Sequence, residues 1–108
     1  MVAPSECQIT GRWRIVASDV WDRDYLDLSG PAYLTIGTDG SAEFAFGALQ
    51  AGGEIEYSRT TVFFRFEGSD EGDETSGEIA AELQDDGTLE IDLTFDKGDD
   101  ATLTAQRA

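Results

Sequence analysis

Carboxylates dominate the reactive side chains of this sequence. The 108 residues include 23 Asp and Glu, no histidine and a single cysteine, Cys7, which is interpreted as an unpaired thiol near a flexible N-terminus. Without histidine there is no Ser-His or Cys-His pair to activate a nucleophile and no imidazole to bind zinc. Two neighbouring carboxylates could perform acid–base hydrolysis, but in so acidic a chain such proximity is uninformative. We therefore expect no catalytic residues, no cofactor and no enzymatic activity.

Eleven of the acids gather in three segments, 19–27, 70–74 and 96–100. Three interpretations are open: a solvated rim, which is favoured; a site for a cationic partner or basic small molecule; and a calcium site. The spacing in 70–74 does not match an EF-hand loop, so no metal ligands are assigned. The residues assigned to the acidic rim are Asp22, Asp24, Asp27, Asp70, Glu71 and Asp73.

A two-residue hydrophobic period, typical of strands, runs through most of the chain. It is clearest where Leu89, Ile91 and Leu93 alternate with acidic and polar residues. Asp39-Gly40 and Asp86-Gly87 favour tight hairpin turns. Residues 53–67 allow two strands or one long strand with a bulge. The predicted strands are 11–17, 32–37, 41–47, 53–58, 61–67, 78–83, 88–96 and 101–107.

The lengths of the connections alternate along this series. Connections after the second, fourth and sixth strands are short, whereas longer ones are predicted at 18–31, 48–52, 68–76 and 97–100. In an antiparallel meander the two sets lie at opposite ends, which brings the acidic segments together at the end built of loops. The prediction is one all-β domain over 1–108, an eight-stranded antiparallel meander closed or nearly closed as a barrel. A curved open sheet or a small sandwich is the alternative.

The segment 17–30 departs from the strand pattern. Trp21, Tyr25 and Leu28 have helical spacing, with Ser18 or Asp19 as the candidate N-cap. We expect a short helical segment over the loop end of the barrel, and we favour a permanent plug over a lid that opens for a ligand.

The two ends of the barrel sequence carry a recognisable signature. Gly11 and Trp13 open the first strand and Arg107 ends the last, so an even number of strands would set the guanidinium across the indole. This arrangement resembles the calycin superfamily, the lipocalins and their relatives. The resemblance implies an up-and-down barrel that often holds an apolar ligand.

A second resemblance covers most of the chain. The series Trp13-Arg14-Ile15, Trp21-Asp22, Asp24 to Asp27, Gly30 to Tyr33 and Phe66-Glu67-Gly68 is similar to a family of small bacterial proteins. No activity is established for that family, so the resemblance implies no functional residues.

The predicted inward face allows either a filled interior or a cavity for one small ligand. Five phenylalanines favour filling, whereas several inward alanines would leave room. On the outward face, Arg12, Arg14 and Arg65 are expected to pair across strands with acids. If a pocket exists, its predicted walls are Trp21, Tyr25, Tyr57 and Phe66.

These features favour a non-enzymatic binding protein that takes a small apolar or aromatic ligand at the open end of the barrel. The alternative is an acidic module that docks a basic protein partner. A net charge of -16 argues against nucleic-acid and membrane partners. The start of the chain predicts a cytoplasmic protein. A monomer or a weak homodimer is expected, the latter through outward Tyr33, Phe63 and Val16.

Overall fold

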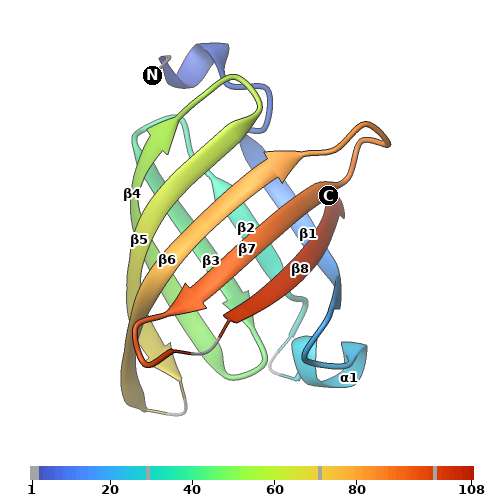
Figure 1. Ribbon diagram of the computed structural model, residues 1–108, viewed down its shortest axis with the longest axis vertical. Helices are drawn as coiled ribbons and strands as arrows, with labels where there is room; N and C mark the ends of the chain where they lie inside the picture. Colours follow the sequence, from blue (N-terminus) through green and yellow to red (C-terminus); the bar gives the residue numbers. More distant parts are fainter. Residues whose placement is uncertain (1–2, 29, 71, 99) are drawn as a thin grey trace.

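Eight antiparallel strands form a closed barrel in the computed structural model, which describes residues 3–28, 30–70, 72–98 and 100–108 (Figure 1). Each strand pairs with the next along the chain, and the first pairs with the last. The closed barrel is confirmed, and the open sheet and the sandwich are excluded. The strands are β1 (Gly11–Ser18), β2 (Tyr33–Ile36), β3 (Ser41–Phe46), β4 (Leu49–Tyr57), β5 (Thr61–Asp70), β6 (Asp73–Leu83), β7 (Leu89–Phe95) and β8 (Asp100–Arg107).

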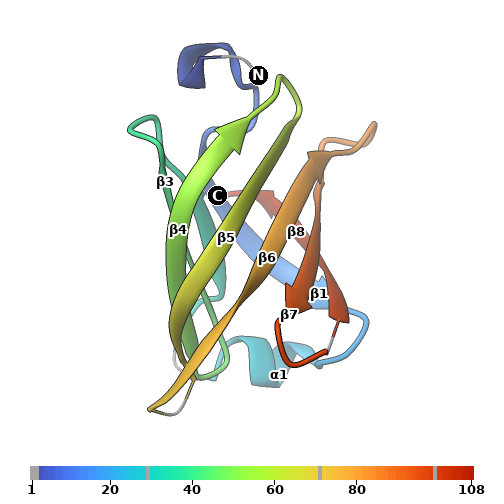
Figure 2. The same ribbon diagram turned by 60° about the vertical axis from the view of Figure 1, so that its left-hand side comes forward.

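Two short helical segments lie at opposite ends of the barrel (Figures 1 and 2). The 3-10 turn η1 (Pro4–Glu6) precedes β1, and the helix α1 (Arg23–Leu26) connects β1 to β2. The α1 end also holds the β3–β4, β5–β6 and β7–β8 connections, as the meander predicts. None of the helices in the described part of the chain has both the length and the apolar character that a membrane crossing requires.

Alternate side chains of each strand fill the interior. In β7, Leu89, Ile91 and Leu93 are buried, while the residues between them are exposed. At the centre of the barrel, the gap among the described side chains is too small for a water molecule; it is lined by Ile15, Leu34, Phe44, Ile79, Ile91 and Leu103. A barrel of eight strands is narrow enough to be filled in this way. The interior is therefore packed core, as the phenylalanines indicated.

The predicted contact between the first and last strands is present. Arg107 lies opposite Trp13 in the β1–β8 ladder, with its guanidinium carbon 4.3 Å from the centre of the indole. The guanidinium also donates hydrogen bonds to the carbonyls of Thr10 (2.5 Å) and Gln8 (2.8 Å). A Cβ at Gly11 would lie 2.9 Å from Arg107 Nη1, so glycine allows this close approach.

The N-terminal segment closes the end of the barrel opposite α1. Ile9 is fully buried, and its carbonyl accepts a hydrogen bond from Trp13 Nε1 at 2.9 Å. Cys7 is also buried, and Gln8 N donates to the carbonyl of Arg59 at 2.6 Å. The prediction that Cys7 is an unpaired thiol is confirmed, but it lies in a segment that these contacts fix to the barrel and not beside a flexible one.

Two of the predicted long loops are strands instead. Residues 49–52 belong to β4, and 68–70 and 73–76 extend β5 and β6 as a paired ribbon to Asp70 opposite Asp73. Their polar and glycine-rich composition conceals strands whose stability comes from ladder hydrogen bonds. The turn contains Gly72 at φ +87°, a conformation that suits glycine in a tight hairpin.

Residues 53–67 form two strands and not one. Ser58 N donates to Thr61 O at 2.8 Å, and the ladder then pairs Tyr57 with Val62. The described β1–β8 ladder does contain an irregularity, between Ile15 and Ala17.

The helical segment differs in detail from its prediction. Its N-cap is Asp22, which accepts a hydrogen bond from Tyr25 N at 2.9 Å, and not Ser18 or Asp19. Leu28 is 61% exposed, whereas Leu26 is fully buried in the core. The helix ends after one turn, at Leu26, so Leu28 lies beyond it and the helical spacing no longer places its side chain on the inner face. Burial of Leu26 supports the plug interpretation.

Candidate functional site

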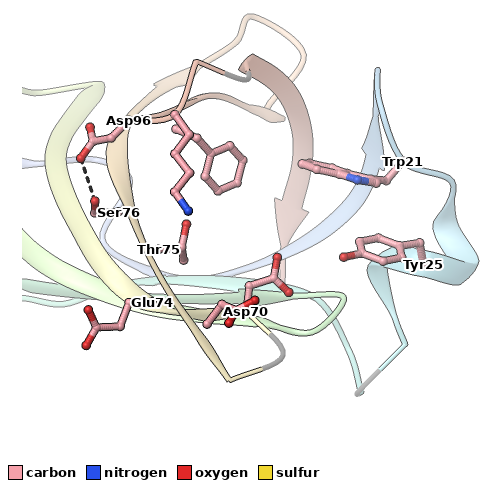
Figure 3. A pocket seen from close by; sticks show the side chains of 10 residues that line it. Trp21, Tyr25, Asp70, Glu74, Thr75, Ser76 and Asp96 are labelled. Carbon is pink, nitrogen blue, oxygen red and sulfur yellow. Dashed lines mark hydrogen bonds between the residues drawn. The ribbon is translucent and has the colours of Figure 1, made fainter.

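A cleft of about 410 Å³ lies at the α1 end of the barrel, outside the packed core. It is bounded by the segment around α1, the β5–β6 ribbon and the end of β7 (Figure 3). Its volume is within the range typical of small-molecule sites. The cleft is lined by Trp21, Tyr25, Asp70, Asp73, Glu74, Thr75, Ser76, Phe95, Asp96 and Lys97.

Trp21 and Tyr25 form an aromatic wall on one side of the cleft (Figure 3). Their rings are stacked, with centroids 5.9 Å apart and planes inclined by 22°. Trp21 also packs on buried Phe46, with the ring centroids 5.0 Å apart, and this contact connects the wall to the core. Both side chains are half-buried, so each is supported and yet reaches the cleft.

Hydrogen bonds to backbone amides and close packing against a glycine hold this wall in place. Ser18 Oγ accepts hydrogen bonds from the amides of Val20 (3.0 Å) and Trp21 (3.3 Å). Gly47 N donates to the carbonyl of Leu26 at 2.8 Å, joining the end of α1 to the β3–β4 turn. Gly47 has φ +57°, and a Cβ there would lie 2.5 Å from the Tyr25 ring. The absent side chain at Gly47 therefore leaves the space that Tyr25 occupies.

Carboxylates form a second wall, carried by the β5–β6 ribbon. Asp70 and Asp73 face each other across the ladder beside the turn, and Glu74 is the next residue of β6. Asp73 and Glu74 are exposed and Asp70 is half-buried. Within the described residues, the acids that form ion pairs are Asp27, Glu78 and Asp96. The ribbon acids Asp70, Asp73 and Glu74 form none with these residues.

Asp96 differs from the other carboxylates of the cleft, because it is held in a polar network. It accepts hydrogen bonds from Ser76 Oγ at 2.7 Å and from the Arg65 guanidinium. These hydrogen bonds lower the pKa of the Asp96 carboxyl, and the bond from Ser76 has the largest effect. The same contact with Asp96 raises the pKa of Arg65, whose Nη1 also lies 3.8 Å from Glu78. Asp96 therefore fixes the ribbon to the end of β7.

The acids predicted to form the rim do not share one role. Asp22 caps α1, and Asp27 binds Arg14 Nη2 at 2.7 Å and accepts a hydrogen bond from Ala32 N at 3.1 Å. Asp24 is exposed, and Asp70 and Asp73 line the cleft. Glu71 lies outside the described residues.

The outward arginines also have different partners. Arg65 pairs across strands with Glu78, as predicted. Arg14 instead pairs with Asp27 in the β1–β2 connection, and Arg12 lies over the ring of Tyr33 at 4.1 Å. Cross-strand pairing therefore describes one of the three.

Two of the four predicted pocket walls lie elsewhere. Tyr57 is at the opposite end of the barrel, where its hydroxyl donates to Gly37 O and accepts from Gly40 N at 3.2 Å. Burial is the main cause that raises its pKa. Phe66 is fully buried and packs edge-to-face on Phe95, with the ring centroids 5.8 Å apart. It therefore supports a residue that lines the cleft without lining the cleft itself. Inward strand parity identified both as interior residues, but it does not say at which height or end of the barrel a side chain lies.

Sequence reasoning did not assign Thr75, Ser76, Phe95 and Lys97 to the site. The first two were hidden because 68–76 was interpreted as a loop, and Phe95 because it continues the inward series of β7. Lys97, the only lysine, lies two residues after Phe95 and directly after Asp96, which was the available signal that the β7 end contributes to the cleft.

The fold and the cleft define a small closed β-barrel with a filled interior and an external site that is both aromatic and acidic. Comparison with models of known protein families and with curated proteins finds no match to this chain. Among the described residues, no group of three or more acidic or cysteine side chains is placed to hold a metal ion.

Proposed function

We propose that this protein is a non-enzymatic, calycin-like binding protein that takes a small ligand with a flat apolar or aromatic group. The ligand sits in the external cleft against Trp21, Tyr25 and Phe95. The observation that carries the proposal is the stacked, half-buried pair Trp21 and Tyr25 on the wall of a cleft of about 410 Å³. Aromatic walls with a few polar groups are typical of small-ligand sites.

The filled core directs the proposal to the outside of the barrel. The central gap between residues such as Ile15 and Phe44 does not admit water, so a ligand there would have to displace core side chains. The cleft needs no such displacement. Trp21 and Tyr25 belong to a segment whose neighbour Leu26 is fixed in the core, so the site is largely preformed.

Titration with tryptophol, a neutral indole alcohol, tests the proposal by two-dimensional ¹H–¹⁵N NMR. We expect shift changes at the Trp21 indole N–H and the amides of 73–76, with a dissociation constant in the micromolar to millimolar range. Trp21→Ala should weaken binding at least tenfold, roughly the loss of one aromatic contact. Phe63→Ala removes an exposed ring from the outer face of β5 and should leave binding unchanged.

Absence of shift changes in the cleft at millimolar tryptophol would exclude this function. Shift changes confined to residues around Phe63 would exclude it equally, because they would report adsorption to an exposed ring.

A basic protein partner docking at the same end is the second candidate, favoured by exposed Asp24, Asp73 and Glu74. Docking through exposed carboxylates should weaken steeply as the ionic strength rises, whereas burial of an aromatic ring should hardly change.

A further inference from the structure

We infer that the cleft selects organic cations, namely small amines in which an ammonium group is joined to an aromatic or apolar group. This inference rests on the proposed function and adds the charge of the ligand to it. It follows from the juxtaposition of the aromatic wall with the carboxylates of the β5–β6 ribbon across one cleft.

The charge of the lining is strongly negative. Asp70, Asp73, Glu74 and Asp96 contribute four carboxylates, and Lys97 contributes the one ammonium. Asp96 is engaged by Arg65 and Ser76, but the ribbon acids form no ion pair with the described residues. Low-dielectric walls concentrate such a field in a cleft and attract cations into it.

The arrangement suits an organic cation better than a metal ion. A metal needs several oxygens converging on one point, and no such group is present among the described acids. An alkylammonium is larger, accepts spread carboxylates, and is also attracted to aromatic faces. The aromatic wall supplies ring faces that attract an ammonium group and that a metal ion would not use as ligands.

The two walls fix the direction of the ligand. Trp21 and Tyr25 lie to one side of the cleft in Figure 3, and Asp70 lies on the ribbon across from them, whereas the Glu74 side chain points away from the two rings. A flat ring placed against the aromatic wall therefore directs its side chain toward the carboxylates. An amine on that side chain meets opposite charge, whereas a carboxylate meets like charge.

Lys97 is the internal competitor of the ligand, because it places an ammonium in the lining of the same cleft. Removing this charge leaves the carboxylates to the ligand. The inference thus predicts a variant that binds better, which a purely structural role of the cleft residues would not produce.

Three ligands with the same ring system test the inference: tryptamine, tryptophol and indole-3-acetate, which carry positive, zero and negative charge. Titrations are followed by NMR at 150 mM NaCl, where general attraction to the acidic protein is screened. We expect tryptamine to bind about tenfold more tightly than tryptophol, and indole-3-acetate about tenfold more weakly, as a partly screened contact with two or more charges gives.

Variants locate the charge effect. The double substitution Asp70→Asn and Asp73→Asn, the ribbon variant, should reduce the advantage of tryptamine over tryptophol to about twofold. Glu82→Gln removes one carboxylate charge near the other end of β6 and should change neither the tryptamine nor the tryptophol affinity. Lys97→Gln should tighten tryptamine by about threefold, whereas Arg59→Gln, a matched loss of positive charge, should not.

The outcomes separate the two proposals. If tryptophol and tryptamine bind in the cleft with equal affinity, the inference is overturned and the proposed function stands. The inference is overturned likewise if Glu82→Gln weakens tryptamine as much as the ribbon variant does. If none of the three indoles binds in the cleft, the proposed function fails and the inference fails with it.

Discussion

Arg107 fixes the two ends of the sheet together through three contacts of one side chain. Its guanidinium stacks on Trp13 and donates to the carbonyls of Gln8 and Thr10. The stacking contributes about 0.5–2 kcal/mol, and each hydrogen bond adds roughly 1 kcal/mol or less because the arginine is partly solvated. We therefore expect Arg107→Ala to lower the free energy of unfolding by about 1–2 kcal/mol, measured by urea denaturation.

Arg59→Ala is the matched control, since Arg59 is an exposed arginine in the β4–β5 turn. Its effect should stay within about 0.5 kcal/mol. Equal losses in the two variants would mean that the charge of the arginine matters and its stacking does not.

Asp96 gives the stability of the barrel a pH dependence. Its pKa is lowered in the folded protein by Ser76 and Arg65, so its stabilising contribution is complete above the unfolded pKa of about 3.9. That contribution is lost as the pH falls through the lower, folded pKa. Asp96→Asn should therefore be less stable than wild type at pH 6, and the difference should shrink toward pH 2.5.

Urea denaturation of both proteins at several pH values measures this difference. Glu82→Gln, an exposed acid on β6 outside the network, controls for the general loss of one charge. A difference between wild type and Asp96→Asn that is constant from pH 6 to pH 2.5 would contradict the assignment.

Among the elements, α1 depends on one buried leucine. Leu26 is fully buried, and its carbonyl accepts the hydrogen bond from Gly47 N. Truncating such a side chain removes apolar burial and leaves a cavity, so Leu26→Ala should cost about 2–4 kcal/mol of unfolding free energy. Leu28→Ala, two residues away and 61% exposed, should cost less than about 0.5 kcal/mol.

These two variants distinguish a plug from a lid. A lid that opens readily contributes little to global stability, so Leu26→Ala would then resemble Leu28→Ala in equilibrium denaturation. A large difference between the two leucines establishes α1 as part of the core.

The elements also show why the sequence predicted the barrel and not the full shape of its open end. Alternation such as Leu89, Ile91 and Leu93 reports burial on one face, and burial is what a closed barrel requires of every strand. The ribbon formed by 68–70 and 73–76 has little apolar surface to report. It is held by backbone hydrogen bonds, which the local amino-acid sequence hardly reveals.

The candidate site could be predicted in part for the same reason. Trp21 and Tyr25 were predicted because aromatic side chains with an indole N–H or a hydroxyl are typical walls of small-ligand sites, and both line the cleft. The ribbon acids were predicted because the meander brings their segment to the same end. Tyr57 and Phe66 were misplaced because the period of two indicates a face and not a height along the barrel. Height depends on register, which the β4–β5 ladder sets through turns with no distinctive sequence.

At the scale of the whole molecule, charge repulsion opposes the compact state. The net charge is -16, and within the described residues only Arg14 and Arg65 form ion pairs. Repulsion among exposed carboxylates acts over several ångströms and is screened by salt, whereas the short ion pairs are few. We therefore expect the melting temperature at pH 7 to rise by roughly 4–8 °C between 20 and 500 mM NaCl, equivalent to about 1 kcal/mol.

Circular dichroism melting curves at several NaCl concentrations measure this rise. Sodium chloride, which at these concentrations acts mainly by screening, is the suitable salt. The ribbon variant, Asp70→Asn with Asp73→Asn, removes two of the charges and should show a smaller rise than wild type. A melting temperature that falls with salt would instead mean that the contacts of Arg14 and Arg65 outweigh the repulsion of all the unpaired acids. In that case the field that attracts cations to the cleft would be weaker than the excess of carboxylates implies.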